Sequence, residues 1–166
     1  KGITVPIAVM NPEPEAFDQM IEFSLEPEIY SLALLRDFEA VLARGGVEGY
    51  PVHLKLNTGM NRSGLDKKDI LELLRFMEGK RTVMLRSMFS HLAAADDPAE
   101  DEFTLGQIRL FEEMTGMVQP HFSYRILRHI LNSAGIERFP QYAFDMVRLG
   151  IGLYGIGPLP GLEPVS

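Results

Sequence analysis

The chain has 166 residues, of which 46% are hydrophobic and 23% are charged, which is enough apolar material for a folded core. The net charge of -7 and the scattered Lys and Arg residues, never more than two in a row, argue against a nucleic-acid surface. The absence of cysteine excludes disulfides and thiolate metal sites, and no apolar run approaches the ~20 residues of a membrane span, so we expect a cytoplasmic protein without membrane or nucleic-acid partners.

Short apolar or alternating runs alternate with amphipathic stretches along the whole chain, a pattern typical of a parallel sheet with crossover helices. The expected elements are, in chain order, strand 4–10, helix 13–23, strand 28–31, helix 32–43, strand 52–57, helix 67–79, strand 83–91, helix 102–118, strand 125–132 and strand 146–154. Gly45 and Gly46 suit the C-terminal end of helix 32–43. No long linker divides the chain, so we expect one domain over residues 1–166.

Repeated strand–helix units of this size fit either an open doubly wound sheet or an eight-stranded barrel. Polar residues lie at the ends of three expected strands and within a fourth. They are Asn57, His91, Asn132 with Ser133, and, in strand 146–154, Arg148. Barrel enzymes place their chemistry at the C-terminal ends of several strands, so these positions favour a barrel. The chain contains no GxGxxG or GxxxxGK pattern, which argues against a nucleotide site.

Residues 53–64, HLKLNTGMNRSG, closely resemble the HLKxDTGMxRxG signature of alanine racemases. Further blocks follow in the order found in that family: FSHLA at 89–93, Gln107 and Phe111, His129 with NSA at 132–134, and VRLGIGLYG at 147–155. The resemblance covers nearly the whole chain. It implies the parallel α/β, (β/α)8 TIM-type barrel of a homodimeric, pyridoxal 5'-phosphate (PLP)-dependent isomerase that interconverts L- and D-alanine for peptidoglycan synthesis.

Aligned with this family, the chain is expected to supply about six of the eight barrel strands. The first two βα units, with the lysine that forms the Schiff base, would precede it. The C-terminal β domain, with the catalytic tyrosine, would follow it. We therefore expect no catalytic residue in the chain itself and no activity of the isolated chain.

The resemblance assigns the cofactor-binding residues one by one. Ser133, with the backbone amides of Gly150 and Ile151, matches the phosphate grip. Arg148 matches the arginine that hydrogen-bonds the pyridine nitrogen, and His129 would support this arginine. A local hydrogen bond explains a strand histidine such as His129 almost as well, and without the resemblance Ser133 is better explained as a turn-forming serine.

Three more positions follow from the same resemblance. His91 matches the histidine that packs against the cofactor ring. Arg62 matches the arginine that reaches the phenolic oxygen of the cofactor and the substrate carboxylate. Lys55 matches a lysine that is carbamylated in many relatives and orients that arginine; a plain ammonium is the alternative. Asn57 stands where the family usually has Asp, which removes a negative charge near Lys55 and Arg62.

Two other functions stay open on the sequence. One is a non-catalytic PLP-binding barrel of the cofactor-homeostasis type, although the TGMNR block favours a racemase; the other is a racemase for another small amino acid such as serine. An incomplete barrel has two unpaired edges, so we also expect association with other chains or segments. The acidic loop 96–102 is expected to be a solvated loop before a helix rather than a metal site.

Overall fold

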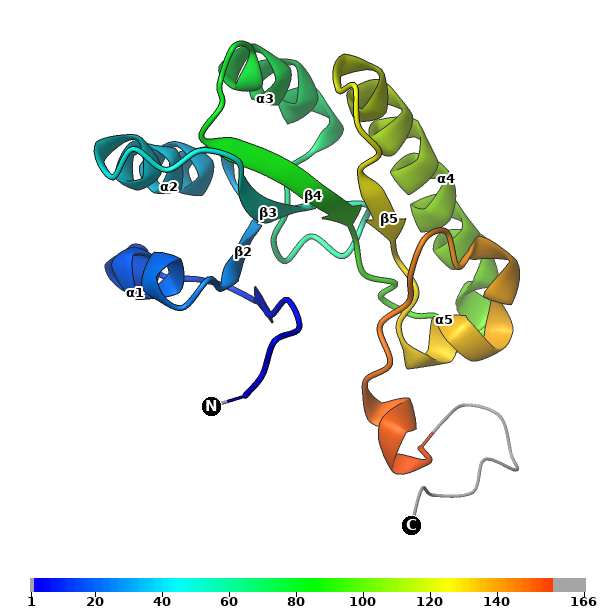
Figure 1. The fold of residues 1–166 in the computed structure, drawn as a ribbon. Coiled ribbons are helices and arrows are strands. Elements are labelled where there is room, and N and C mark those ends of the chain that lie inside the picture. Colours follow the sequence, from blue (N-terminus) through cyan, green and yellow to red (C-terminus); the bar gives the residue numbers. More distant parts are fainter. Residues whose placement is uncertain (1, 157–166) are drawn as a thin grey trace.

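A computed structural model describes residues 2–156, which form a curved five-stranded parallel sheet (Figure 1). The strands are β1 (Ala8–Val9), β2 (Glu26–Ile29), β3 (Tyr50–Lys55), β4 (Val83–Phe89) and β5 (Leu127–His129). Each strand pairs with the next one along the chain, in the order β1-β2-β3-β4-β5. This is the strand order of a parallel barrel wall, and all the C-terminal ends of the strands lie at one edge of the sheet.

The helices that connect the strands follow one another around the outer side of the sheet (Figure 1). They are α1 (Phe17–Glu22), α2 (Leu32–Arg44), α3 (Ile70–Met77) and α4 (Asp101–Val118), and a short fifth helix, α5 (Ser133–Arg138), follows β5. The first four confirm the helices expected from apolar periodicity; α5 was not expected. Within residues 2–156, none of the helices combines the length and hydrophobicity that a membrane crossing requires.

Local capping explains where α2 begins and ends and where α5 begins. The Ser31 hydroxyl accepts a hydrogen bond from the backbone N–H of Leu34 and so caps the start of α2. After α2 the chain reverses at Gly46, whose φ of 64° favours glycine. The Asn132 side chain accepts from the N–H of Gly135 in the same way, and this cap starts α5 directly after β5.

The strand expected at 146–154 is wrong, so the described residues contain five strands rather than six. This segment follows β5 for only a short distance, where Arg148 donates its backbone N–H to the Leu131 carbonyl. The chain then turns at Gly150, with φ -108° and ψ -107°, into a 3-10 helix at Ile151–Tyr154. Alternating apolar residues suggested a strand, but Ile151 and others of the segment are exposed, and alternation without a pairing partner does not make a strand.

The two faces of the sheet differ sharply in chemistry. On β3, Val52 and Leu54 are fully buried among the helices, whereas His53 and Lys55 alternate with them and point to the inner face. The register places His53 beside Ser87 and Lys55 beside Phe89 on β4. The inner face also carries Glu26, Glu28 and His129. Barrel interiors are usually filled by branched apolar side chains, so this polar face indicates a functional role.

The outer core is centred on an aromatic cluster, in which the Phe38 ring lies 4.9 Å from Phe17 and 5.4 Å from Tyr50. We expect Phe38→Ala to lower the free energy of unfolding by about 3–5 kcal/mol, because it leaves a cavity in a fully buried site. The shift of the urea midpoint would measure this loss. Phe23→Ala is the matched control: Phe23 is 64% exposed, so an equal loss in that variant would contradict the prediction.

Candidate functional site

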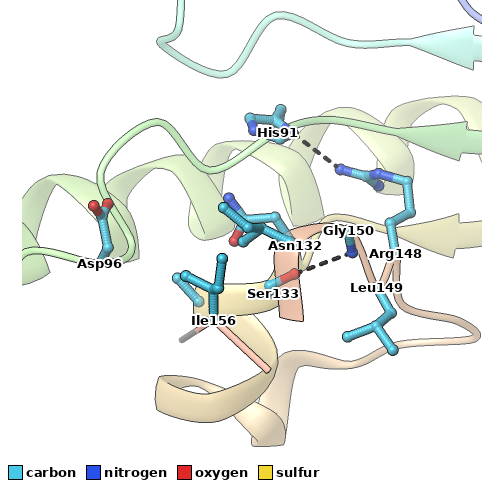
Figure 2. A pocket seen from close by; sticks show the side chains of 10 residues that line it. His91, Asp96, Asn132, Ser133, Arg148, Leu149, Gly150 and Ile156 are labelled. Atoms are coloured by element: carbon cyan, nitrogen blue, oxygen red, sulfur yellow. Dashed lines mark hydrogen bonds between the residues drawn. The ribbon is translucent and has the colours of Figure 1, made fainter. Parts of the chain in front are cut away.

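A cavity of about 600 Å³ lies at the C-terminal ends of β4 and β5 (Figure 2). Its wall contains five of the residues expected to bind the cofactor: His91, Ser133, Arg148, Gly150 and Ile151. His91 follows β4, Ser133 begins α5 directly after β5, and the other three belong to the segment that replaces the sixth expected strand. Residues from three separate stretches of the sequence therefore meet at one site.

Ser133 organises the loop at one side of this cavity. Its hydroxyl oxygen is buried and accepts hydrogen bonds from the backbone N–H groups of Gly150 and Gly152, each at 3.0 Å (Figure 2 shows the first). A Cβ atom at Gly152 would lie only 3.2 Å from Ser133 Cβ, so a side chain there would push the loop away. The two N–H groups form a cluster around the hydroxyl oxygen, which leaves the hydroxyl hydrogen free to donate to an anionic group such as a phosphate.

Arg148 forms the opposite side of the cavity, and its guanidinium is held from several directions. Nη2 donates to the carbonyls of Ser90 at 2.6 Å and Ile130 at 3.2 Å, and Nη1 donates to Nδ1 of His129 at 2.7 Å. The guanidinium carbon lies 5.3 Å from the centre of the Phe89 ring. Burial lowers the pKa of Arg148 to about 10, so the group is still a cation at neutral pH.

The two histidines beside Arg148 are neutral. Burial, and then the charge of Arg148, lower the pKa of His129 to about 3 and that of His91 to about 4. His129 stacks on Phe89 with ring centres 5.1 Å apart, whereas His91 faces the cavity with Nδ1 3.5 Å from Arg148 Nη2 (Figure 2). His91 therefore offers a neutral ring to a ligand.

Lys55 is buried below the cavity, on the inner face of the sheet. Its Nζ lies 2.8 Å from Glu28 Oε1, and the Glu28 side chain is fully buried. The other carboxylate oxygen of Glu28 accepts from the backbone N–H of Asn11. Lys55 also lies over the Phe89 ring, at 5.8 Å. An ammonium group is the form that these neighbours stabilise.

Arg62 lies in the loop that follows β3 and is exposed. Within residues 2–156 its guanidinium forms no hydrogen bond or ion pair, yet its charge contributes to the lowered pKa of His91. The loop is shaped by Asn57, whose amide donates to Asp66 at 2.9 Å and whose oxygen accepts from the N–H of Asn61. An aspartate at position 57 could not donate to Asp66, so this contact depends on the amide.

Comparison with known proteins agrees with this geometry: residues 1–158 match the family model described as the N-terminal domain of alanine racemase. The chain belongs to this family. An alanine racemase from Prochlorococcus marinus is 36% identical over 98% of the chain and 43% of the relative. The chain thus spans less than half the length of the relatives that it matches.

Solved alanine racemases share the fold. A Clostridium difficile alanine racemase in complex with cycloserine superposes with a TM-score of 0.85 at 29% identity, covering 96% of this chain and 43% of that one. An alanine racemase from Bartonella henselae with covalently bound pyridoxal phosphate superposes with a TM-score of 0.82 at 25% identity, covering 99% and 45%. The expected class, a parallel α/β barrel present in part, is confirmed.

Some residues that build this site received no role from the sequence. The Gln107 side chain, buried in α4, accepts from the N–H of Ala93 and donates to the carbonyl of His91, so it holds the loop after β4. Glu28 and Phe89 surround the buried cations. The signal that could have identified Glu28 is its alternation with Ile29 on β2, which points the carboxylate to the inner face.

We expect Lys55 to stay an unmodified ammonium, because a carbamate would place a second negative charge beside the Glu28 carboxylate. The test is NMR of the full-length protein in isotope-labelled bicarbonate. A carbamate at Lys55 would give a signal that disappears in Lys55→Arg, and we expect no such signal. In Glu28→Gln, which keeps the shape and deletes the charge, such a signal becomes possible. A labelled carbamate at Lys55 in the unaltered protein would contradict the prediction.

The lowered pKa of His129 also predicts a pH dependence of stability. The folded ring has a pKa of about 3 and the unfolded ring about 6.5, so the unfolded state binds more protons between these values. The stabilisation is complete above pH 6.5 and is lost as the pH falls towards 3, with a limiting slope of about 1.4 kcal/mol per pH unit. Urea unfolding between pH 6.5 and 4 measures how the free energy of unfolding depends on pH. This dependence should be weaker in His129→Gln and unchanged in His121→Gln, where the replaced residue is exposed.

Proposed function

We propose that this chain is the cofactor-binding barrel portion of a PLP-dependent alanine racemase, which interconverts L- and D-alanine for peptidoglycan synthesis. The observation that carries the proposal is a buried cation, Arg148, held on one side of a cavity whose other side is the N–H cluster around Ser133. The relatives that match the chain are alanine racemases, and one solved relative contains covalently bound pyridoxal phosphate.

The residues present fit PLP in size, charge and order. The cavity of about 600 Å³ is within the range of small-molecule sites. In this proposal Ser133, Gly150 and Ile151 would hold the phosphate, with the Ser133 hydroxyl accepting from Gly150 and donating to the phosphate. Arg148 would donate to the pyridine nitrogen, and the neutral ring of His91 would pack against the cofactor ring.

When bound, PLP supplies an electron sink for the carbon atom that loses its hydrogen. Arg148 donates a hydrogen bond towards the ring nitrogen but keeps its own proton, since its pKa of about 10 lies well above neutrality. A ring nitrogen that only accepts a hydrogen bond is a weaker sink than a protonated one. Arg148 therefore limits side reactions such as transamination, at some cost in the acidity of the substrate carbon.

Arg62 and Lys55 are the proposed substrate-side residues. Arg62 is exposed and unpaired among the described residues, and its planar set of donors suits a carboxylate and a phenolic oxygen. Lys55 forms an ion pair with Glu28, so the pair as a whole adds no net charge to this part of the site. The charges of both contribute to the lowered pKa of His91, which supports a position near the proposed ring site.

The racemase as a whole needs groups that this chain does not supply. We propose that the imine-forming lysine and a catalytic tyrosine come from the rest of the polypeptide, in a cytoplasmic homodimer. Two features of the described residues favour such association: β1 is an open edge of the sheet, and exposed apolar side chains lie near it and beyond β5. These side chains include Val5 and Ile7 near β1, and Leu149 and Leu153 beyond β5.

The test is racemisation by the full-length protein with and without PLP, followed by loss of optical activity of L-alanine. We expect PLP-dependent activity, and in Arg148→Lys a kcat lower by about 10- to 100-fold, because charged hydrogen bonds worth about 1.5–3 kcal/mol are lost. Arg109→Lys, on the exposed face of α4, is the control and should keep full activity.

Two results would replace this function. PLP binding, seen by absorbance, without racemisation of any amino acid would support a cofactor-homeostasis barrel. Racemisation of serine in preference to alanine would retain the chemistry and change the substrate.

A further inference from the structure

A line of buried hydrogen bonds runs from Arg148 across the inner face of the sheet, through one side chain on each of β5, β4, β3 and β2. Arg148 Nη1 lies 2.7 Å from His129 Nδ1, and His129 Nε2 lies 3.1 Å from the Ser87 hydroxyl. The same hydroxyl lies 2.7 Å from His53 Nδ1, and His53 Nε2 lies 2.8 Å from a carboxylate oxygen of Glu26. His53 and Glu26 have no role in the proposed cofactor site.

The two ends of this line determine where its protons lie. A guanidinium can only donate, so His129 Nδ1 accepts and its proton is on Nε2, from which it donates to Ser87. A carboxylate can only accept, so His53 Nε2 donates to Glu26 and His53 Nδ1 is free to accept. The hydroxyl of Ser87 completes the line by accepting from His129 and donating to His53. Every hydrogen bond then points from Arg148 towards Glu26.

The surrounding charges keep both rings neutral, as this arrangement requires. Burial lowers the pKa of His53, and so does Arg86, while Glu26 raises it in part. Burial, Arg148 and His53 lower the pKa of His129, and Asp145 opposes them. Glu26, only 5% exposed, has Arg86 as its other neighbour, with Nη1 3.5 Å from its second oxygen.

We infer that Ser87, His53 and Glu26 are positioning residues for Arg148, which act on it by holding His129 in a single tautomer. With the opposite tautomer, an N–H group of His129 would face an N–H group of Arg148 at 2.7 Å, and the guanidinium would have to move. Its direction towards the cavity therefore depends on a carboxylate three strands away. The catalytic consequence rests on the proposed function; the proton arrangement does not.

The first test is NMR of the full-length protein with nitrogen-labelled histidine, each ring signal being assigned by a single His→Gln substitution. At neutral pH, the signals of His129 and His53 should both show a neutral ring protonated on Nε2, and the His129 ring should stay neutral down to about pH 5.5. A proton on Nδ1 of either ring at neutral pH, or a His129 ring that titrates near 6.5, would overturn the inference. This measurement needs neither PLP nor activity.

The second test is Glu26→Gln, which keeps the shape but offers His53 both a donor and an acceptor, so that the line can reverse. We expect a mixture of His53 tautomers and a kcat for alanine about tenfold lower, with KM little changed; a tenfold loss is the low end of the effect of removing outer partners at metal sites. Glu39→Gln is the matched control, because Glu39 is 9% exposed and is bound by Thr82 and Lys80 outside the line.

Each outcome of the second test decides the inference. An unchanged kcat, or a lower kcat with unchanged ring signals, would mean that the line only packs the sheet. The proposed function fails separately, if the unaltered protein does not racemise alanine while its histidine signals are as expected.

Discussion

The site depends on the burial of one cation, the guanidinium of Arg148. A buried charge is unstable unless hydrogen bonds replace its water, and those bonds come here from the chain immediately after β4, from β5 and from the residue that follows it. Meeting this requirement brings Ser90, His129 and Ile130 to fixed positions around the guanidinium. The cavity lies where they converge, and its far side is closed by the loop that Ser133 holds.

The same constraint extends down the inner face of the sheet. Glu26, Glu28 and Lys55 are all nearly inaccessible to solvent, and each carboxylate has a cationic or hydrogen-bonding neighbour. Removing one member of a buried pair leaves a costly uncompensated charge, so the arrangement tolerates few alternatives. An apolar interior would stabilise a barrel equally well, but it could not orient an arginine. The polar interior is therefore better explained by the chemistry at the strand ends than by folding.

Local patterns predicted much of this structure because their causes are local. The periodicity of helix 32–43 reflects burial of one face, and α2 is found there, from Leu32 to Arg44. The segment at 146–154 shows where such reasoning fails: its alternation is that of a strand, but pairing requires a neighbour that no local pattern reveals. Helix α5 was missed for a related reason, since a six-residue helix stabilised by the side chain of Asn132 is too short to show periodicity.

By itself, the sequence determined the family, the parallel α/β class and five of the residues that line the cavity, because motifs and the alternation of strands and helices can be recognised from consecutive residues. Only the tertiary structure decided the partners of those residues: Glu28 for Lys55, and the line from His129 through Ser87 and His53 to Glu26. The physical reason is that these contacts join neighbouring strands far apart in the chain. Hydrogen bonds and ion pairs form only between side chains that are close in space, and the register of the strands decides which side chains those are.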